Sequence, residues 1–317
     1  MKVPLWTSSL INLRESIFRG YIENISPLRI GAGKEPPLSS LVDLAIIKIR
    51  YGGYEIPYIP GSSLKGLFRS QAGKMATSLG LSVCNGLAKD NCVDVKRVTI
   101  RGREYVLRDL IDECMRDRRS SEAMEYFFNN ACIICRIFGS IMYRSKVIFS
   151  DAYPIDEDGN LLPFKLGSRT GIAIDRRTGA VVRGALYEVE YIEPGCRFKF
   201  EVRCHNLPNY ALGLLSSIIR MIDSGEIKIG GFTSRGYGSV KIKKLEAFVK
   251  SFGPGKENKV LSSLEQNIDE GVDVSDISEF KDGLLYFSEN NVWKLIDRLE
   301  GVWYGATSRI KSRERKA

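Results

Sequence analysis

Hydrophobic and polar positions repeat along this chain with two periods, which predict strands in some segments and helices in others. Alternation with a period of two is typical of a strand, because successive side chains of a strand point to opposite faces. The segments expected to be extended cover residues 15–32, 42–49, 187–191, 198–204 and 239–248. Apolar residues three and four positions apart predict helices. These helices cover residues 62–79, 120–138 and 210–224.

The order of these segments predicts an α+β fold with a ferredoxin-like, RRM-like core. Two insertions are expected in this core. The first, at about 84–140, joins a polar, irregular stretch over 84–119, rich in Arg and Asp, to a helical lid, and the second, at 164–185, is expected to be a basic β-hairpin. A further hairpin is expected around Pro194 and Gly195, where one alternating segment ends and the next begins.

A change of composition at Phe252-Gly253-Pro254-Gly255 divides the chain. We expect one domain over residues 1–250 and a C-terminal extension over 251–317. The extension contains an amphipathic helical pattern from Val292 to Trp303 and ends in a basic tail that we expect to be solvated.

Composition narrows the class of partner. The chain has 317 residues, 44% of them hydrophobic, so it can bury a core. A formal net charge of +9 favours a polyanionic partner such as nucleic acid; the alternative is a basic surface of the thermophilic type, since 27% of the residues are charged. The longest apolar runs are too short to span a bilayer, and the N-terminus lacks the apolar stretch of a signal peptide. We therefore expect a soluble, cytoplasmic protein without a membrane partner.

The chain contains one histidine, His205. Cleavage of RNA by a pair of histidines within one chain is therefore excluded, and any ribonuclease chemistry must use a carboxylate, lysine, tyrosine or metal ion. Since His205 follows an alternating segment, we expect it to end a strand.

Two glycine-containing motifs combine backbone N–H groups with cations. In Ile59–Arg69, a proline and a glycine end a strand, Ser62 and Ser63 offer capping oxygens, and Lys65 and Arg69 follow on the helix. The N-terminus of a helix attracts phosphate, so this segment predicts an anion site. The second motif, Gly230–Gly238, holds Arg235 among four glycines. The alternative reading of both motifs is a tight turn that requires positive φ angles.

These motifs resemble those of the CRISPR-associated RAMP superfamily, and in particular the backbone subunit of type III effector complexes. Two further segments, Cys132–Ser140 and Gly171–Gly179, occur in the family order. The resemblance covers about residues 15–250. It implies a filament of several copies that winds along a guide RNA together with other effector-complex subunits, and a β-hairpin thumb inserted into the guide–target duplex. Phosphate contacts without base readout suit a protein that must accept any guide sequence.

The resemblance assigns RNA binding to the two motifs and to the basic hairpin. The residues are Ser62, Ser63, Lys65, Arg69, Arg169, Arg176, Arg177, Gly230, Gly231, Ser234, Arg235, Gly236, Tyr237 and Gly238.

The resemblance also implies that a loop aspartate cuts target RNA, and the matching residue is Asp43. The target 2′-OH would attack the adjacent phosphate, while the carboxylate positions a divalent ion (Mg²⁺ or Mn²⁺) or helps to deprotonate the hydroxyl. No second carboxylate is near in sequence, so a two-metal site within one chain is not expected. Glu35 is a lesser candidate. The structural alternative is that Asp43 caps the start of a strand.

Seven cysteines raise the question of a structural zinc site. Cys132 and Cys135 have the spacing of half a zinc knuckle, and Cys84 with Cys92 would complete it. The spacing of Cys84 and Cys92 is loose for a knuckle, and Cys135 also fits the apolar stripe of its helix, so a core role for it remains open.

Three functions follow from these observations. The leading hypothesis is a guide-RNA-binding backbone subunit that cleaves target RNA, the second is a purely structural subunit of the same complex, and the third is a repeat-processing endoribonuclease. The third ranks last because about 80 residues follow the glycine loop and His205 is poorly placed for catalysis.

Overall fold

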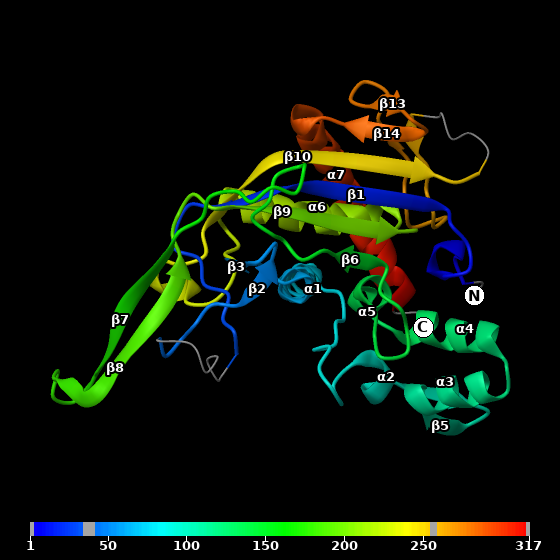
Figure 1. The fold of residues 1–317 in the computed structure, drawn as a ribbon. Coiled ribbons are helices and arrows are strands. Elements are labelled where there is room, and N and C mark those ends of the chain that lie inside the picture. Colours follow the sequence, from blue (N-terminus) through cyan, green and yellow to red (C-terminus); the bar gives the residue numbers. More distant parts are fainter. Residues whose placement is uncertain (1–2, 34–41, 254–258, 315–317) are drawn as a thin grey trace.

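The computed structural model describes residues 3–33, 42–253 and 259–314, and its centre is an antiparallel sheet of six strands (Figure 1). In spatial order the strands are β13 (Glu279–Lys281), β14 (Leu284–Phe287), β10 (Val240–Ser251), β1 (Arg14–Asn24), β9 (Arg197–His205) and β6 (Val147–Phe149). The expected mixture of helices and strands is therefore confirmed.

Helices cover one face of this sheet, and the alternation in the strands explains why. In β1 and β9 one set of alternate residues, including Phe18, Ile22 and Phe198, is buried. Helix α1 (Gly61–Ser78) contacts β6, and α6 (Asn209–Ser224) contacts β10. The expected helices 62–79 and 210–224 are thus found within a residue of their predicted bounds.

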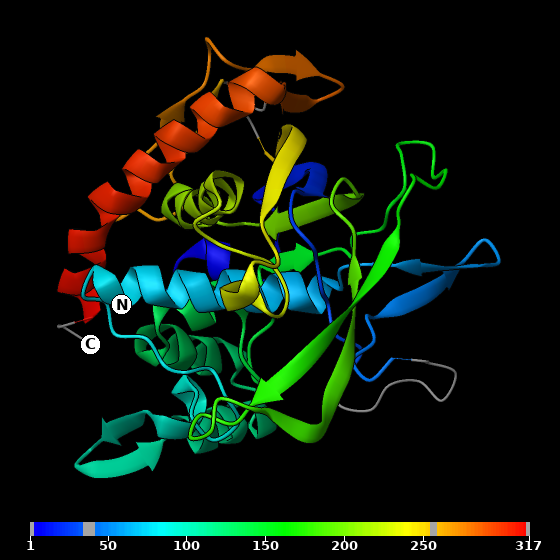
Figure 2. The ribbon, with the colours of Figure 1, turned by 90° about the vertical axis from the view of Figure 1, so that its left-hand side faces the viewer.

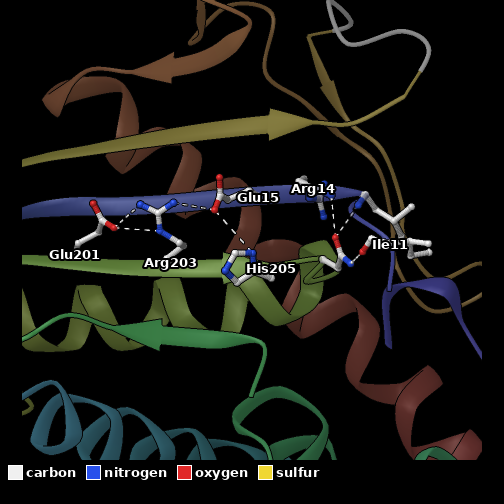
Figure 3. A network of polar contacts seen from close by, with 8 residues as sticks. Ile11, Arg14, Glu15, Glu201, Arg203 and His205 are labelled. Atoms are coloured by element: carbon white, nitrogen blue, oxygen red, sulfur yellow. Dashed lines mark hydrogen bonds and ion pairs between the residues drawn. The ribbon is translucent and has the colours of Figure 1, made fainter. Parts of the chain in front are cut away.

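The opposite face of the sheet is charged and ion-paired (Figure 3). Arg203 donates to Glu15 at 2.9 Å and to Glu201 at 2.9 Å. His205 is the last residue of β9, as expected, and its Nδ1 lies 3.8 Å from Glu15. Because acidic partners neutralise these cations, this face offers little attraction to an RNA backbone.

The first insertion contains more regular structure than expected. Its elements are α2 (Cys92–Val95), β4 (Arg97–Ile100), β5 (Arg103–Val106), α3 (Leu107–Arg116), α4 (Ser120–Asn130) and α5 (Ile133–Phe138). The prediction of an irregular stretch at 84–119 is wrong for α3, which buries Leu107, Leu110, Ile111 and Cys114. The single helix expected over 120–138 is also wrong, because extended backbone at Ala131 and Cys132 separates α4 from α5.

The basic hairpin consists of β7 (Leu166–Ile174) and β8 (Val181–Ile192), and it projects away from the body (Figures 1 and 2). The hairpin expected at Pro194 and Gly195 is wrong, since β8 pairs with β7 while β9 joins the main sheet. A small hairpin, β2 (Lys48–Tyr51) and β3 (Tyr54–Pro57), precedes α1. Only the last two residues of the extended segment expected over 42–49 belong to β2, and before them Leu44 and Ile46 form isolated bridges to Val189 and Gly31.

The C-terminal segment packs onto the same body. After the short pair β11 (Val260–Leu261) and β12 (Val272–Asp273), strand β14 joins β10, and the long helix α7 (Glu289–Glu314) packs along α6. The expected amphipathic stripe is buried. The prediction of a solvated tail is wrong for the residues up to Glu314, because the side chain of Arg313 is largely buried and ion-paired with Glu265. None of the helices in the described part of the chain is both long and apolar enough to cross a membrane.

Candidate nucleic-acid interface

Helix α1 begins one residue earlier than its serines suggested. Its N-cap is Pro60, and neither serine caps the helix, so the expected capping role of Ser62 and Ser63 is wrong. The N–H of Gly61 donates instead to Oδ1 of Asp151 at 2.7 Å. Both serines are exposed and lie in the first turn of the helix.

A cationic pocket of about 510 Å³ lies beside this first turn. Its walls include Lys65, Arg69 and Arg144, and no acidic residue is among those that line it. Burial and the neighbouring Arg69 lower the pKa of Lys65, as expected when two cations share a confined space. The hydroxyl oxygen of Ser140, also in the wall, is buried and has no hydrogen-bond partner among the residues that the structure describes. Such a pocket favours an anion that accepts hydrogen bonds.

Arg69 has structural partners in this pocket. Its Nη1 donates to the carbonyl oxygen of Gly139 at 2.9 Å, and its Nη2 lies 3.5 Å from Sγ of Cys135. Lys65 and Arg144 are therefore the cations of this pocket with the fewest partners among the described residues. Arg144 follows the Cys132–Ser140 motif by four residues, but its role was not foreseen from the sequence.

The glycine loop is held in an unusual backbone conformation. Gly230, Gly236 and Gly238 have φ angles of +86°, +87° and +85°, and a Cβ on Gly238 would lie 2.2 Å from the carbonyl oxygen of Ile229. The loop is tied to the end of β1 by the N–H of Gly238, which donates to the carbonyl oxygen of Pro27 at 2.8 Å. The alternative prediction for these glycines, tight turns that require positive φ angles, is thus confirmed, whatever the loop binds.

Arginine and aromatic side chains surround the loop. Two guanidinium groups lie near the ring of Phe232. That of Arg235 is 4.7 Å from the ring centre, and that of Arg29 is 5.2 Å from the same ring centre. Arg169, on β7, lies 5.8 Å from the ring of Tyr237. Burial lowers the pKa of Arg29, and its Nε has no hydrogen-bond partner. Three arginines without an acidic partner in the described residues make this a second cationic patch.

The structure joins the glycine loop to the middle of the β7–β8 hairpin. Arg235 donates to the hydroxyl of Tyr187 at 3.1 Å. The ring of Tyr187 covers Gly171 on the paired strand, where a Cβ would lie 2.2 Å from it. Sequence reasoning missed Arg29 and Tyr187; the only signal for Arg29 was its place just before Gly31 and Gly33.

Asp43 lies beside the same middle part of the hairpin. It is exposed, and its Oδ2 accepts a hydrogen bond from the N–H of Glu188 at 2.7 Å. Leu44 continues the contact with two backbone hydrogen bonds to Glu188 and Glu190. The lesser candidate Glu35 lies outside the described residues.

The predicted RNA-binding residues fall into three groups in the structure. Arg169 and Arg235 lie together at the glycine loop, whereas Lys65 and Arg69 lie at the separate pocket. No hydrogen bond or ion pair in the described segments joins the loop to the first turn of α1. Arg176 and Arg177 lie exposed at the far tip of the hairpin (Figure 1). In that tip the N–H of Arg177 donates to Asp175.

The four predicted metal ligands, Cys84, Cys92, Cys132 and Cys135, do come together. Their Sγ atoms all lie within 4.8 Å of one another, and Cys84 lies 3.8 Å from Cys132 and 3.4 Å from Cys135. A tetrahedral zinc with bonds of about 2.3 Å separates its sulfurs by about 3.8 Å. Hydrogen bonds from Cys135 and Cys84 lower the pKa of Cys132. The donor set and spacing fit zinc.

Comparison with known proteins agrees with the sequence motifs. A family model described as the RAMP superfamily matches residues 21–241. The chain is similar to the CRISPR system Cms endoribonuclease Csm3 of Methanocaldococcus jannaschii, at 28% identity over 257 residues that cover 78% of this chain and 88% of that protein. The family match includes Asp43, all four clustered cysteines and the glycine loop. The resemblance to the family is thereby confirmed: the chain belongs to the RAMP superfamily.

Proposed function

We propose that this chain is the guide-RNA-binding backbone subunit of a type III CRISPR effector complex and that it cleaves target RNA within that complex. The family match and the similarity to an endoribonuclease of a CRISPR system support the assignment. The strand order β10-β1-β9-β6, with α1 and α6 as the two connecting helices, supports a ferredoxin-like core as the framework. Its partners are guide RNA, target RNA, further copies of itself and other subunits.

Two cationic patches grip the guide. Lys65 and Arg144 bind phosphate in the pocket beside α1, with Ser62 and Ser63 as hydroxyl donors. Arg29, Arg169 and Arg235 bind it at the glycine loop. Both patches consist of cations without acidic partners in the described chain, whereas the charges of the open sheet face are paired. Such contacts read the backbone and leave the base sequence free.

The single observation that carries the catalytic assignment is the place of Asp43. The N–H of Glu188 donates to its carboxylate, and the preceding residue, Tyr187, accepts a hydrogen bond from Arg235 of the glycine loop. An RNA held at the glycine loop therefore passes close to Asp43. In the reaction, the carboxylate accepts the proton of the 2′-OH while O2′ bonds to phosphorus and the P–O5′ bond breaks. The products are a 2′,3′-cyclic phosphate and a 5′-hydroxyl, which takes up a proton from solvent.

A divalent metal ion at Asp43 would be held by this one carboxylate together with phosphate oxygens of the bound RNA, since Mg²⁺ commonly takes one or two carboxylates and substrate phosphates. Among the described residues no group of three ligands forms around Asp43, and its Oδ2 already accepts from the N–H of Glu188. We therefore derive no step through a metal held by this chain alone.

Asp43→Asn and Asp43→Ala test the assignment in the assembled complex. Asparagine keeps an oxygen that can accept from the N–H of Glu188 but loses the base. We expect both variants to bind guide and target normally and to lose cleavage by at least about 100-fold. Cleavage by Asp43→Asn at the wild-type rate would show that Asp43 has no chemical role.

The structural subunit remains the second candidate, because the hydrogen bond between Asp43 and Glu188 is what a capping role predicts. Under that function Asp43→Ala lowers stability, Asp43→Asn does not, and neither changes a cleavage rate.

Zinc completes this proposal as a structural metal. Cys84, Cys92, Cys132 and Cys135 hold it, and it fastens the segment after α1 and the start of α2 to the first turn of α5. Because the unfolded chain has no preformed site, binding of the metal stabilises the fold.

A further inference from the structure

Arg69 connects the four-cysteine site to the cationic pocket. One arm of its guanidinium reaches Sγ of Cys135 at 3.5 Å, and the other donates to the carbonyl oxygen of Gly139 at 2.9 Å. Gly139 forms part of the pocket wall and has a φ angle of +84°. One side chain therefore touches both a metal ligand and the loop that shapes the phosphate pocket.

A third contact encloses the same guanidinium. Gly86 follows Cys84 by two residues, has a φ angle of +72°, and would place a Cβ 3.0 Å from both Nε and Nη2 of Arg69. The turn after one cysteine thus lies against Arg69 on one side, and the helix that holds Cys135 lies against it on the other. A guanidinium held this way has little freedom to turn toward an RNA phosphate.

We propose that Arg69 is a positioning residue that couples metal loading of the cysteines to RNA affinity. A metal-bound thiolate is a stronger hydrogen-bond acceptor than a thiol, so the metal strengthens the contact between Arg69 and Cys135. The fixed guanidinium in turn holds the Gly139 loop, on which Ser140 and Arg144 face the pocket. Loss of the metal frees Arg69 and loosens that wall. This inference rests on the proposed function, because the ligand of the pocket is taken to be RNA phosphate.

The competing role is a direct phosphate contact by Arg69, and a thermodynamic cycle separates the two. The affinity of the full chain for a labelled single-stranded RNA of mixed sequence is measured for wild type and Arg69→Met, each with zinc and after chelation. Coupling between sites usually amounts to about 5–150-fold. We expect chelation to weaken wild-type binding at least about fivefold and to change binding by Arg69→Met less than twofold. Equal weakening of both proteins by chelation would overturn the coupling.

A second measurement needs no RNA. Cobalt(II) in the four-cysteine site gives thiolate-to-metal absorption bands, which respond to a hydrogen bond on sulfur. We expect these bands to shift in Arg69→Met, and zinc to be lost to a chelator faster. Arg69→Lys, which cannot span both partners, is expected to behave like Arg69→Met. Unchanged bands and release rates would overturn the contact itself.

Lys74→Met is the matched control, because it removes an exposed cation from the same helix without touching the cysteines. Its zinc affinity and cobalt bands should equal those of the wild type, and its RNA affinity should keep the full dependence on zinc. Circular dichroism checks that each protein is folded after chelation. If zinc-loaded wild type shows no salt-sensitive RNA binding, the proposed function fails, while the cobalt bands still test the contact of Arg69 with Cys135.

Discussion

Replacing Gly66 by alanine is expected to stabilise this protein and weaken its binding to RNA. Gly66 is exposed within α1, one turn after Ser62 and on the same face, and a Cβ there would have no heavy atom within 4 Å. Alanine in the interior of a helix is favoured over glycine by about 1 kcal/mol. For a chain of this size such a gain raises the melting temperature by about 2 °C.

The weaker binding has a separate cause. If guide RNA crosses α1 at Ser62 and Lys65, the glycine lets its backbone approach the helix, and an added methyl group holds it off. Loss of one hydrogen bond to a charged group such as phosphate costs about 1.5–3 kcal/mol, which raises Kd roughly 10- to 150-fold. Fluorescence anisotropy with labelled RNA at fixed salt measures the affinity, and thermal unfolding measures the stability.

Gly301→Ala in α7 is the matched control, since Gly301 is also exposed in a helix with open space around its Cα. It should raise the melting temperature by a similar amount and leave the affinity unchanged. Should Gly66→Ala bind RNA as tightly as wild type while gaining stability, the path of the RNA over the first turns of α1 is refuted.

Three further outcomes follow from the structure. Cys132→Ser should lower the zinc content from about one equivalent to less than a tenth, measured by metal analysis, whereas Cys114→Ser should keep it; equal content in both would exclude the site. Burial lowers the pKa of Lys146 from 10.5 to about 8, so between these values the unfolded state binds more protons and stability rises with pH. Lys146→Met should remove up to about 3 kcal/mol of that rise, measured by urea unfolding from pH 7.5 to 10.5, and an unchanged slope would contradict it. Gly238→Ala should lower the free energy of unfolding by about 2–5 kcal/mol and Gly236→Ala by only about 1–2 kcal/mol. Both glycines have positive φ angles, but only a Cβ on Gly238 would meet a backbone oxygen. Equal losses of stability in urea unfolding would argue against this difference.

The sequence predicted elements whose causes are local. Helix α1 and helix α6 follow from apolar spacing over their own residues, and the strand β9 follows from its alternation. The cysteine cluster was also recognised, because thiols in such a pattern have few other uses inside a chain.

The errors concern partners that are distant in sequence. The serines were expected to cap α1, but the carboxylate of Asp151, ninety residues away, takes the first N–H. The helix expected over 120–138 breaks at Cys132, whose N–H donates to Sγ of Cys92 at 3.2 Å. Periodicity within a segment contains no information on such contacts. For the same reason, Arg29 and Arg144 were missed until the fold placed them beside the two motifs.

The margins of the central sheet restrict how copies of this chain can associate. On one margin, β14 pairs with β10 only over Ala247–Val249. The part of β10 that β14 leaves unpaired contains Lys241, Lys243 and Lys244, and its pairing with β1 has a register shift there. The other margin, β6, is three residues long. Lysines, irregular pairing and short outer strands all discourage a foreign strand from adding to a sheet. Neighbouring copies are therefore expected to meet through side chains and to keep their sheets separate, so that a row of subunits can form and come apart without fusing into a continuous β structure.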